Sequence, residues 1–159
     1  GVQIAFASCL FAQSIDMDKI RKDFSKGHKD KDLCATHLKD LEKHADTPIE
    51  RGYEAAYHMF MAKHAGNPFK KMSYFKDGKS MLEKEIASSP QNIELRFIRL
   101  CIQYYVPKYL NYSSNVEEDK KYLMNNLYKI SDREVKDLIY QYLKGAKMYT
   151  ENELALLGR

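Results

Sequence analysis

The stretch from Asn92 to Tyr105 constrains the fold more than any other part of this sequence. Its apolar residues occupy two faces of a helix, and only a narrow stripe that includes Arg96 and Arg99 is polar. A helix that is apolar on nearly all sides is usually packed by neighbours over most of its surface. We therefore expect a central, largely buried helix around which the other elements are arranged.

The rest of the chain is predicted to be helical as well. Helical periodicity recurs in residues 16–27, 32–45, 47–66, 70–87, 116–130 and 131–146, and a short last helix starts near residue 150. Four capping boxes mark helix starts, at Thr47–Glu50, Ser114–Glu117, Ser131–Glu134 and Thr150–Glu153. No strand pattern is found. The sequence therefore predicts an all-α fold, an array of six or seven helices arranged as antiparallel hairpins.

The bulk composition indicates one globular helical domain. The chain has 159 residues, of which 30% are charged and 44% are hydrophobic, which suffices for a sizeable core. The net charge of +4 arises in residues 63–84, which contain six lysines but only two acidic residues, Asp77 and Glu83. Because a mild basic stretch on a helix is typical of a solvated face, we expect no nucleic acid partner.

Residues 2–13 form an uncharged, mostly apolar run that ends abruptly at Ser14. The run is similar to the tail of a secretory signal peptide, and Phe6-Ala-Ser-Cys9 is loosely similar to a lipoprotein cleavage box. We therefore separate a signal-peptide-like segment, residues 1–13, from the helical domain, residues 14–159. This division predicts an exported, periplasmic or envelope-associated protein, with membrane association only through an N-terminal anchor. The alternative is a cytoplasmic protein in which the run is an ordinary first helix. With or without export, we expect the uncleaved run to form a helix that packs in a groove of its own domain or of a second copy in a homodimer.

Residues 52–127 resemble tetratricopeptide-like helical hairpins. The closest piece is residues 74–92, where Gly78, Leu82 and Pro90 occupy the places of a small residue, a bulky residue and a turn proline in such a repeat. The departures from the pattern are Glu85, Arg96, Leu100 and the lengthened turn Gly66-Asn-Pro-Phe69.

The resemblance implies a helical groove that binds a protein or peptide. The positions of the central helix that would face this groove are Glu94, Phe97, Cys101, Tyr104 and Tyr105. Two segments, residues 61–69 and residues 94–99, also resemble an uncharacterised exported bacterial family. This second resemblance implies no activity for the chain.

The sequence shows no recognisable catalytic or metal-binding motif. It has no phosphate loop, no nucleophile elbow and no His-Glu-x-x-His pattern. The three cysteines lack zinc spacing, and Cys34 and Cys101 fall on apolar helix faces that indicate buried thiols. His37, Asp40 and His44 share a helix face, but without the Glu-x-x-His spacing of di-iron bundles. We expect no catalytic residue, no metal and no cofactor.

Two features remain as candidates for a binding site. Arg96 and Arg99 lie on an otherwise buried helix; they either pair with acidic neighbours such as Glu117, Glu118 or Asp119, or clamp a carboxylate of a ligand. Four tyrosines surround Pro107, and they either pack in the core or form an aromatic patch for a partner. The candidate binding residues are Glu94, Arg96, Arg99, Tyr105, Tyr109 and Tyr112.

These observations favour a non-enzymatic binding or scaffolding module that uses a helical groove for a protein or peptide partner. The second hypothesis is an enzyme of unrecognised type that uses Arg96 and Arg99 with nearby carboxylates. A deep polar pocket with convergent titratable groups would favour the enzyme, and a long open groove would favour the module.

Overall fold

Eight α-helices and three short 3-10 turns make up the fold in the computed structural model, which describes residues 1–3 and 15–159. The α-helices are α1 (Met17–Asp23), α2 (Lys31–His44), α3 (Pro48–His64), α4 (Pro68–Ser88), α5 (Ile93–Tyr105), α6 (Val116–Asn126), α7 (Arg133–Gly145) and α8 (Glu151–Leu157). The 3-10 turns are η1 (Phe24–Lys26), η2 (Lys108–Leu110) and η3 (Leu127–Lys129). No strand occurs within these described residues, and the predicted all-α fold is confirmed. The described residues form eight α-helices, against the six or seven of the predicted array, and these include the short α1 and α8 that the sequence indicates at residues 16–27 and near residue 150.

The helix starts follow the capping signals of the sequence only in part. Thr47 and Thr150 form the predicted capping boxes at α3 and α8, each with the glutamate three residues later. At α7 the cap is Asp132, whose carboxylate accepts from the Val135 amide, so the predicted box at Ser131 is wrong. The predicted box at Ser114 is also wrong. The residue before α6 is Asn115, and its side-chain oxygen accepts from Gln103 of α5 rather than from its own helix.

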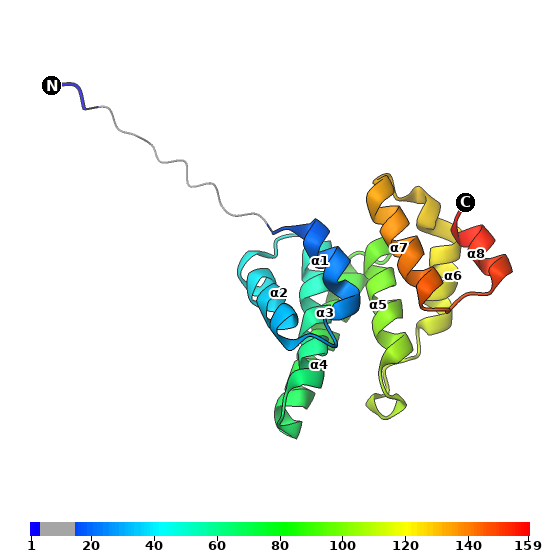
Figure 1. Ribbon diagram of the computed structural model, residues 1–159, viewed down its shortest axis with the longest axis horizontal. Coiled ribbons are helices and arrows are strands. Elements are labelled where there is room, and N and C mark those ends of the chain that lie inside the picture. The colour runs from blue at the N-terminus through cyan, green and yellow to red at the C-terminus, as the bar shows by residue number, and fades with distance from the viewer. Residues whose placement is uncertain (4–14) are drawn as a thin grey trace.

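The helices pack as neighbours along the chain and form two groups (Figure 1). In the first group α3 lies between α2 and α4 and contacts both over much of its length. In the second group α6 packs on α5 and on α8. Helix α5 contacts α3 and α4 as well as α6, so it is the junction between the groups.

The closest helix pair is α3 and α4, and a glycine permits their approach. A Cβ atom built on Gly78 of α4 would lie 2.6 Å from the backbone oxygen of Ala55 in α3. Any side chain at this position would therefore push the two helices apart. Gly78, which occupies a small-residue position in the tetratricopeptide-like pattern, thus lies where α3 and α4 approach each other.

Helix α5 is the buried centre that its sequence predicts. Ten consecutive residues, Glu94 to Gln103, are buried. Leu95, Ile98 and Leu100 are fully inaccessible to solvent and belong to the one apolar cluster that joins both helix groups. The helix ends at Tyr105, two residues before Pro107, because the residue before a proline disfavours helical dihedral angles.

The signal-peptide-like run falls mostly outside the described residues, since residues 4–14 are not among them. Its predicted helix in a groove stays a prediction. Among the described residues, no helix is both long enough and apolar enough to cross a membrane.

Truncating a side chain at the centre of α5 should destabilise the protein strongly. We expect Leu100→Ala or Phe97→Ala to lower the free energy of unfolding by about 3 kcal/mol, because each leaves a cavity among packed neighbours. Tyr104→Ala, on the same helix but 42% exposed, is the matched control and should cost much less. Denaturant unfolding measures all three. A loss below about 0.5 kcal/mol at Leu100, the range of surface positions, would contradict the central placement of α5.

Candidate binding groove

One buried carboxylate fixes α5 to α6. Asp119, in the first turn of α6, is completely buried and accepts hydrogen bonds from two arginines of α5. Arg99 donates from Nε at 2.7 Å to Oδ2 and from Nη2 at 3.0 Å to Oδ1, and Arg96 donates from Nε at 2.5 Å to Oδ1. The two guanidinium groups thus surround one carboxylate, as Arg geometry suits.

The outer ends of both arginines are also occupied. Arg96 donates to Glu118 and to the Pro90 carbonyl oxygen, and its guanidinium lies 4.2 Å from the ring centroid of Tyr122. Arg99 donates to Glu83 of α4 at 2.9 Å. Burial works to lower the pKa of Arg99, but its bonds to Asp119 outweigh burial and raise that pKa above its ordinary value. The expectation that the protein's own acids anchor Arg96 and Arg99 is confirmed.

A second buried carboxylate fixes α5 to the first helix group. Glu94 accepts from Arg21 of α1, at 2.6 Å from Nε and 3.0 Å from Nη2, and from the Tyr53 hydroxyl of α3 at 2.7 Å. Burial, followed by the Glu94 charge, raises the pKa of Tyr53 well above its ordinary value, so the phenol stays protonated and donates. Glu94 is therefore engaged inside the protein.

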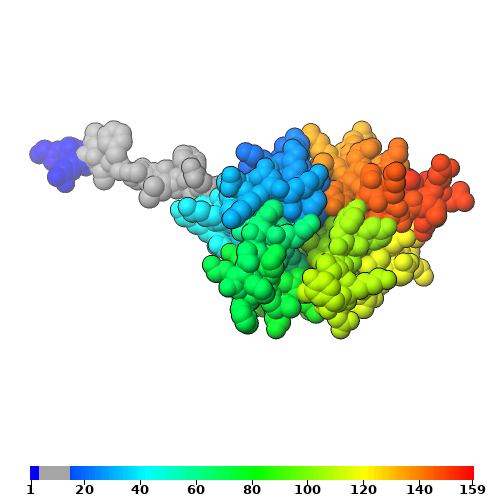
Figure 2. All heavy atoms as spheres, turned by 60° about the horizontal axis from the view of Figure 1, so that its bottom comes forward, coloured from blue at the N-terminus to red at the C-terminus, as the bar shows by residue number. Residues whose placement is uncertain are grey.

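Between these two anchors the helix groups enclose a large groove of about 1240 Å³. Its walls come from α1, α3 and α4 on one side, and from α5, α7 and the connection after α5 on the other. Figure 2 shows the molecule hollowed between α4, in green, and the yellow-green of α5 and that connection.

The floor of the groove is a cluster of aromatic rings contributed by four different elements. Phe24 of η1 lies 5.5 Å from Tyr53, 5.4 Å from Phe60 and 5.8 Å from Phe97, measured between ring centroids. Tyr142 of α7 lies 5.6 Å from Phe24 and makes an edge contact with Phe97. Such distances are those of favourable aromatic pairs, so the floor is rigid and apolar.

The rim of the groove is basic. Arg21, Lys22, Lys29, Lys63 and Lys71 line it together with His28, and no aspartate or glutamate does so among the described residues. Partial burial lowers the pKa of His28, and the charges of Lys63, Lys29 and the nearby His64 lower it further. The depressed pKa of His28 thus results first from burial and second from the positive local field.

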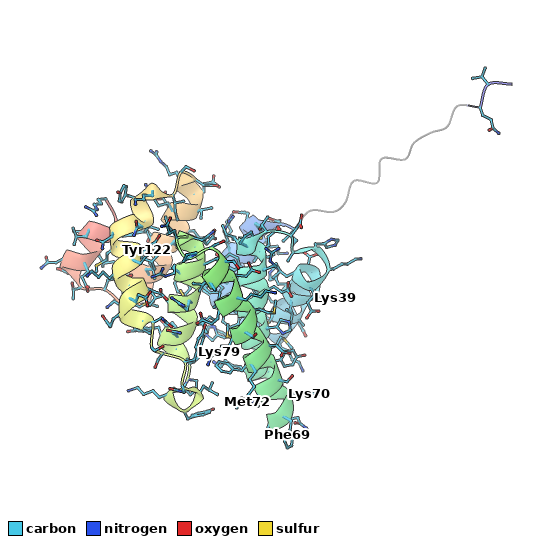
Figure 3. The ribbon with its side chains drawn as sticks, turned by 180° about the vertical axis from the view of Figure 1, so that it is seen from behind. Lys39, Phe69, Lys70, Met72, Lys79 and Tyr122 are labelled. Carbon is cyan, nitrogen blue, oxygen red and sulfur yellow. The ribbon has the colours of Figure 1, made fainter. Side chains whose placement is uncertain are left out.

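Exposed apolar side chains form the two lips of the groove. Met72 lies near the tip of α4, next to the outward-pointing Phe69 (Figure 3). On the other lip, Tyr105 is 60% exposed and Tyr109 is 84% exposed. Large apolar groups that are exposed together at the mouth of a groove are typical of interaction sites.

The structure brings together only part of the predicted binding residues. Tyr105 and Tyr109 line the groove, whereas Tyr112 is buried against Phe75 of α4, with ring centroids 6.0 Å apart. Of the positions implied by the tetratricopeptide resemblance, Phe97, Cys101 and Tyr105 line the groove. The sequence reasoning missed the walls from α1, α3 and α7, such as Phe60 and Tyr142, because each belongs to a helical pattern that also explains a core position.

The groove and its surroundings hold little that points to catalysis. Burial raises the pKa of Cys101 well above its ordinary value, which disfavours the thiolate form that a nucleophile requires. Within residues 1–3 and 15–159, no three His, Cys, Asp or Glu side chains gather as a metal site would require.

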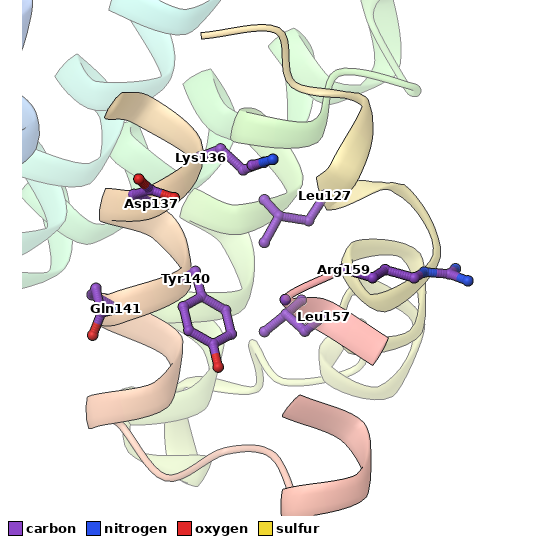
Figure 4. Close-up of a pocket in the computed structure, with 8 residues that line it drawn as sticks. Leu127, Lys136, Asp137, Tyr140, Gln141, Leu157 and Arg159 are labelled. Atoms are coloured by element: carbon purple, nitrogen blue, oxygen red, sulfur yellow. The ribbon is translucent and has the colours of Figure 1, made fainter. Parts of the chain in front are cut away.

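A second, smaller cavity of about 320 Å³ lies between α7 and α8, where Tyr140 faces Leu157 (Figure 4).

Comparison of the chain with family models, with curated proteins and with solved structures finds no match.

Removing the shared carboxylate should destabilise the fold far more than removing its neighbour. Asp119→Ala leaves two buried guanidinium groups without their common partner, and we expect a loss of about 3–5 kcal/mol in the free energy of unfolding. Glu117→Ala is the matched control, since Glu117 is exposed in the same first turn of α6 and should cost no more than about 0.5 kcal/mol. Equal losses, measured by denaturant unfolding, would contradict the anchoring role of Asp119.

Proposed function

We propose that this protein is a non-enzymatic binding or scaffolding module, and that the groove takes an apolar segment of a protein or peptide partner. The observation that carries the proposal is the groove of about 1240 Å³ with an aromatic floor and exposed apolar lips. Small-molecule pockets are typically about 300–1,000 Å³. A groove of this size, left open between two helix groups, suits a segment of polypeptide better than a metabolite.

The polar chemistry near the groove supports binding rather than catalysis. The enzyme hypothesis relies on Arg96 and Arg99, but both guanidinium groups are already bonded to Asp119 and to further acids of the same chain. Three of the five N–H donors of each guanidinium are bonded inside the protein, so neither arginine can turn toward a substrate without breaking buried bonds. No observation favours the enzyme hypothesis over the module.

The tetratricopeptide likeness and the export of the protein remain predictions. The likeness agrees with the proposal in one respect, because three of the five positions that it assigns to a groove line the groove described above: Phe97, Cys101 and Tyr105.

A library of random 16-residue peptides, displayed on phage and selected on the full chain, tests the proposal. We expect enriched peptides whose affinity falls about tenfold, or roughly 1.4 kcal/mol, in the double variant Met72→Gln and Tyr105→Gln, which removes apolar surface from both lips. The matched control is Tyr128→Gln with Leu156→Gln, at two side chains that are exposed to a similar extent but do not line the groove.

The control should leave peptide affinity unchanged within about twofold, well inside the tenfold change expected at the lips. Circular dichroism and thermal unfolding confirm that both variants are folded. If no peptide is enriched, or if the lip and control variants weaken binding equally, the groove is not a binding site and the proposal fails.

A further inference from the structure

The charge on the groove rim is one-sided and largely uncompensated. Lys22 pairs with Asp18 at 2.8 Å, outside the groove. Lys29, Lys63 and Lys71 make no ion pair with any acid of the described chain. Elsewhere the protein pairs its buried and half-buried arginines with its own carboxylates. Many lysines elsewhere on the surface also lack an ion pair, so what distinguishes the rim is its sign: six basic side chains and no aspartate or glutamate line the groove among the described residues.

The cations come from segments that meet at one end of the first helix group, where His64 bonds to the carbonyl oxygen of Gly27. Lys29 follows η1, Lys63 lies in the last turn of α3, and Lys71 lies in the first turn of α4. Lys63 lies at the C-terminal, negative end of the α3 dipole, where a cation stabilises the helix. Lys71 lies near the N-terminal, positive end of the α4 dipole, where a cation is unfavourable. Helix stability therefore does not explain Lys71. A negatively charged ligand on the rim would compensate for it.

The walls of the groove suit a helix. They are themselves helices, with side chains that project as ridges into which another helix can pack. Met59 and Met72 both line the groove, and methionine adapts its shape to an incoming side chain. An amphipathic helix binds such grooves through apolar residues at positions i, i+3 or i+4, and i+7, with its polar face toward the rim.

We infer that the partner of the groove is an acidic amphipathic helix, whose apolar face packs on the aromatic floor and whose carboxylates lie against Lys29, Lys63 and Lys71. This inference rests on the proposed function, because it names the chemistry of the partner for the same groove. Opposite charge on the two surfaces selects such a helix over a basic one and speeds its association.

The peptide selection described above tests this inference through the charge of the enriched peptides. We expect the enriched sequences to share the helical apolar spacing and to carry net negative charge. The affinity of an enriched peptide should fall at least about tenfold in the triple variant Lys29→Glu, Lys63→Glu and Lys71→Glu. A peptide with its acids changed to lysine should bind that variant better than the original peptide does.

A matched control distinguishes the effect of the rim lysines on peptide affinity from the effect of the protein's net charge. Lys39→Glu, Lys84→Glu and Lys121→Glu change the net charge by the same amount at exposed positions that do not line the groove. Figure 3 shows Lys39 on α2, away from α4 and its labelled Lys70 and Met72. This control should weaken peptide binding by less than about threefold, because remote surface charges are screened at physiological salt.

If the groove binds something other than an acidic helix, these experiments give different results. Enrichment of neutral or basic peptides that still depend on Met72 and Tyr105 would overturn the acidic partner and leave the proposed function intact. Failure to enrich any groove-dependent peptide would overturn both. Two further results would also overturn the peptide partner. One is tight binding to phosphatidylglycerol vesicles but not to phosphatidylcholine vesicles, lost in the triple rim variant. The other is a concentration-dependent dimer in sedimentation that the same variant abolishes.

Discussion

The arrangement of the whole molecule depends on the carboxylate of Asp119. This carboxylate is completely buried, and it accepts hydrogen bonds from the Nε atoms of both Arg96 and Arg99. Without it, two buried positive charges on α5 would lose their common partner. Breaking a buried ion pair of this kind is costly, because the charge that remains has lost its hydration. The position of α5 against α6 is therefore fixed by charge geometry as well as by apolar packing.

A groove can remain open beside α5 because the helix is anchored to both helix groups. Glu94 bonds to Arg21 and Tyr53 in the first helix group, while Arg96 and Arg99 bond to Asp119 in the second. Apolar packing alone would tend to close the space between the groups, since burial of the floor and lips is favourable. Directional polar contacts, by contrast, are satisfied at only one relative placement. The rim lysines Lys29, Lys63 and Lys71 line this groove.

The sequence contains enough local information for the helices but not for the groove. Apolar periodicity identified α5, and Thr47 and Thr150 identified two helix starts, because caps and periodicity act within a few residues. Helix α6 was predicted but its cap was not, because Asn115 bonds to Gln103, a contact between helices. The tetratricopeptide resemblance placed Phe97 in a groove, but the walls from the other elements were missed for a similar reason. Phe24 and Tyr142 meet Phe97 only in the folded chain, and each was explained by its own helical pattern as a core residue.

The most direct test of the central claim uses the methionines as reporters of where a peptide binds. The chain has seven methionines, and Met59 and Met72 line the groove while Met81, Met124 and Met148 do not. Methyl NMR spectra of ¹³C-methionine protein should show shifts at Met59 and Met72 on addition of a selected peptide, with Met81, Met124 and Met148 unchanged. Shifts confined to Met124 and Met148, with Met59 and Met72 unmoved, would place the peptide elsewhere and contradict the account.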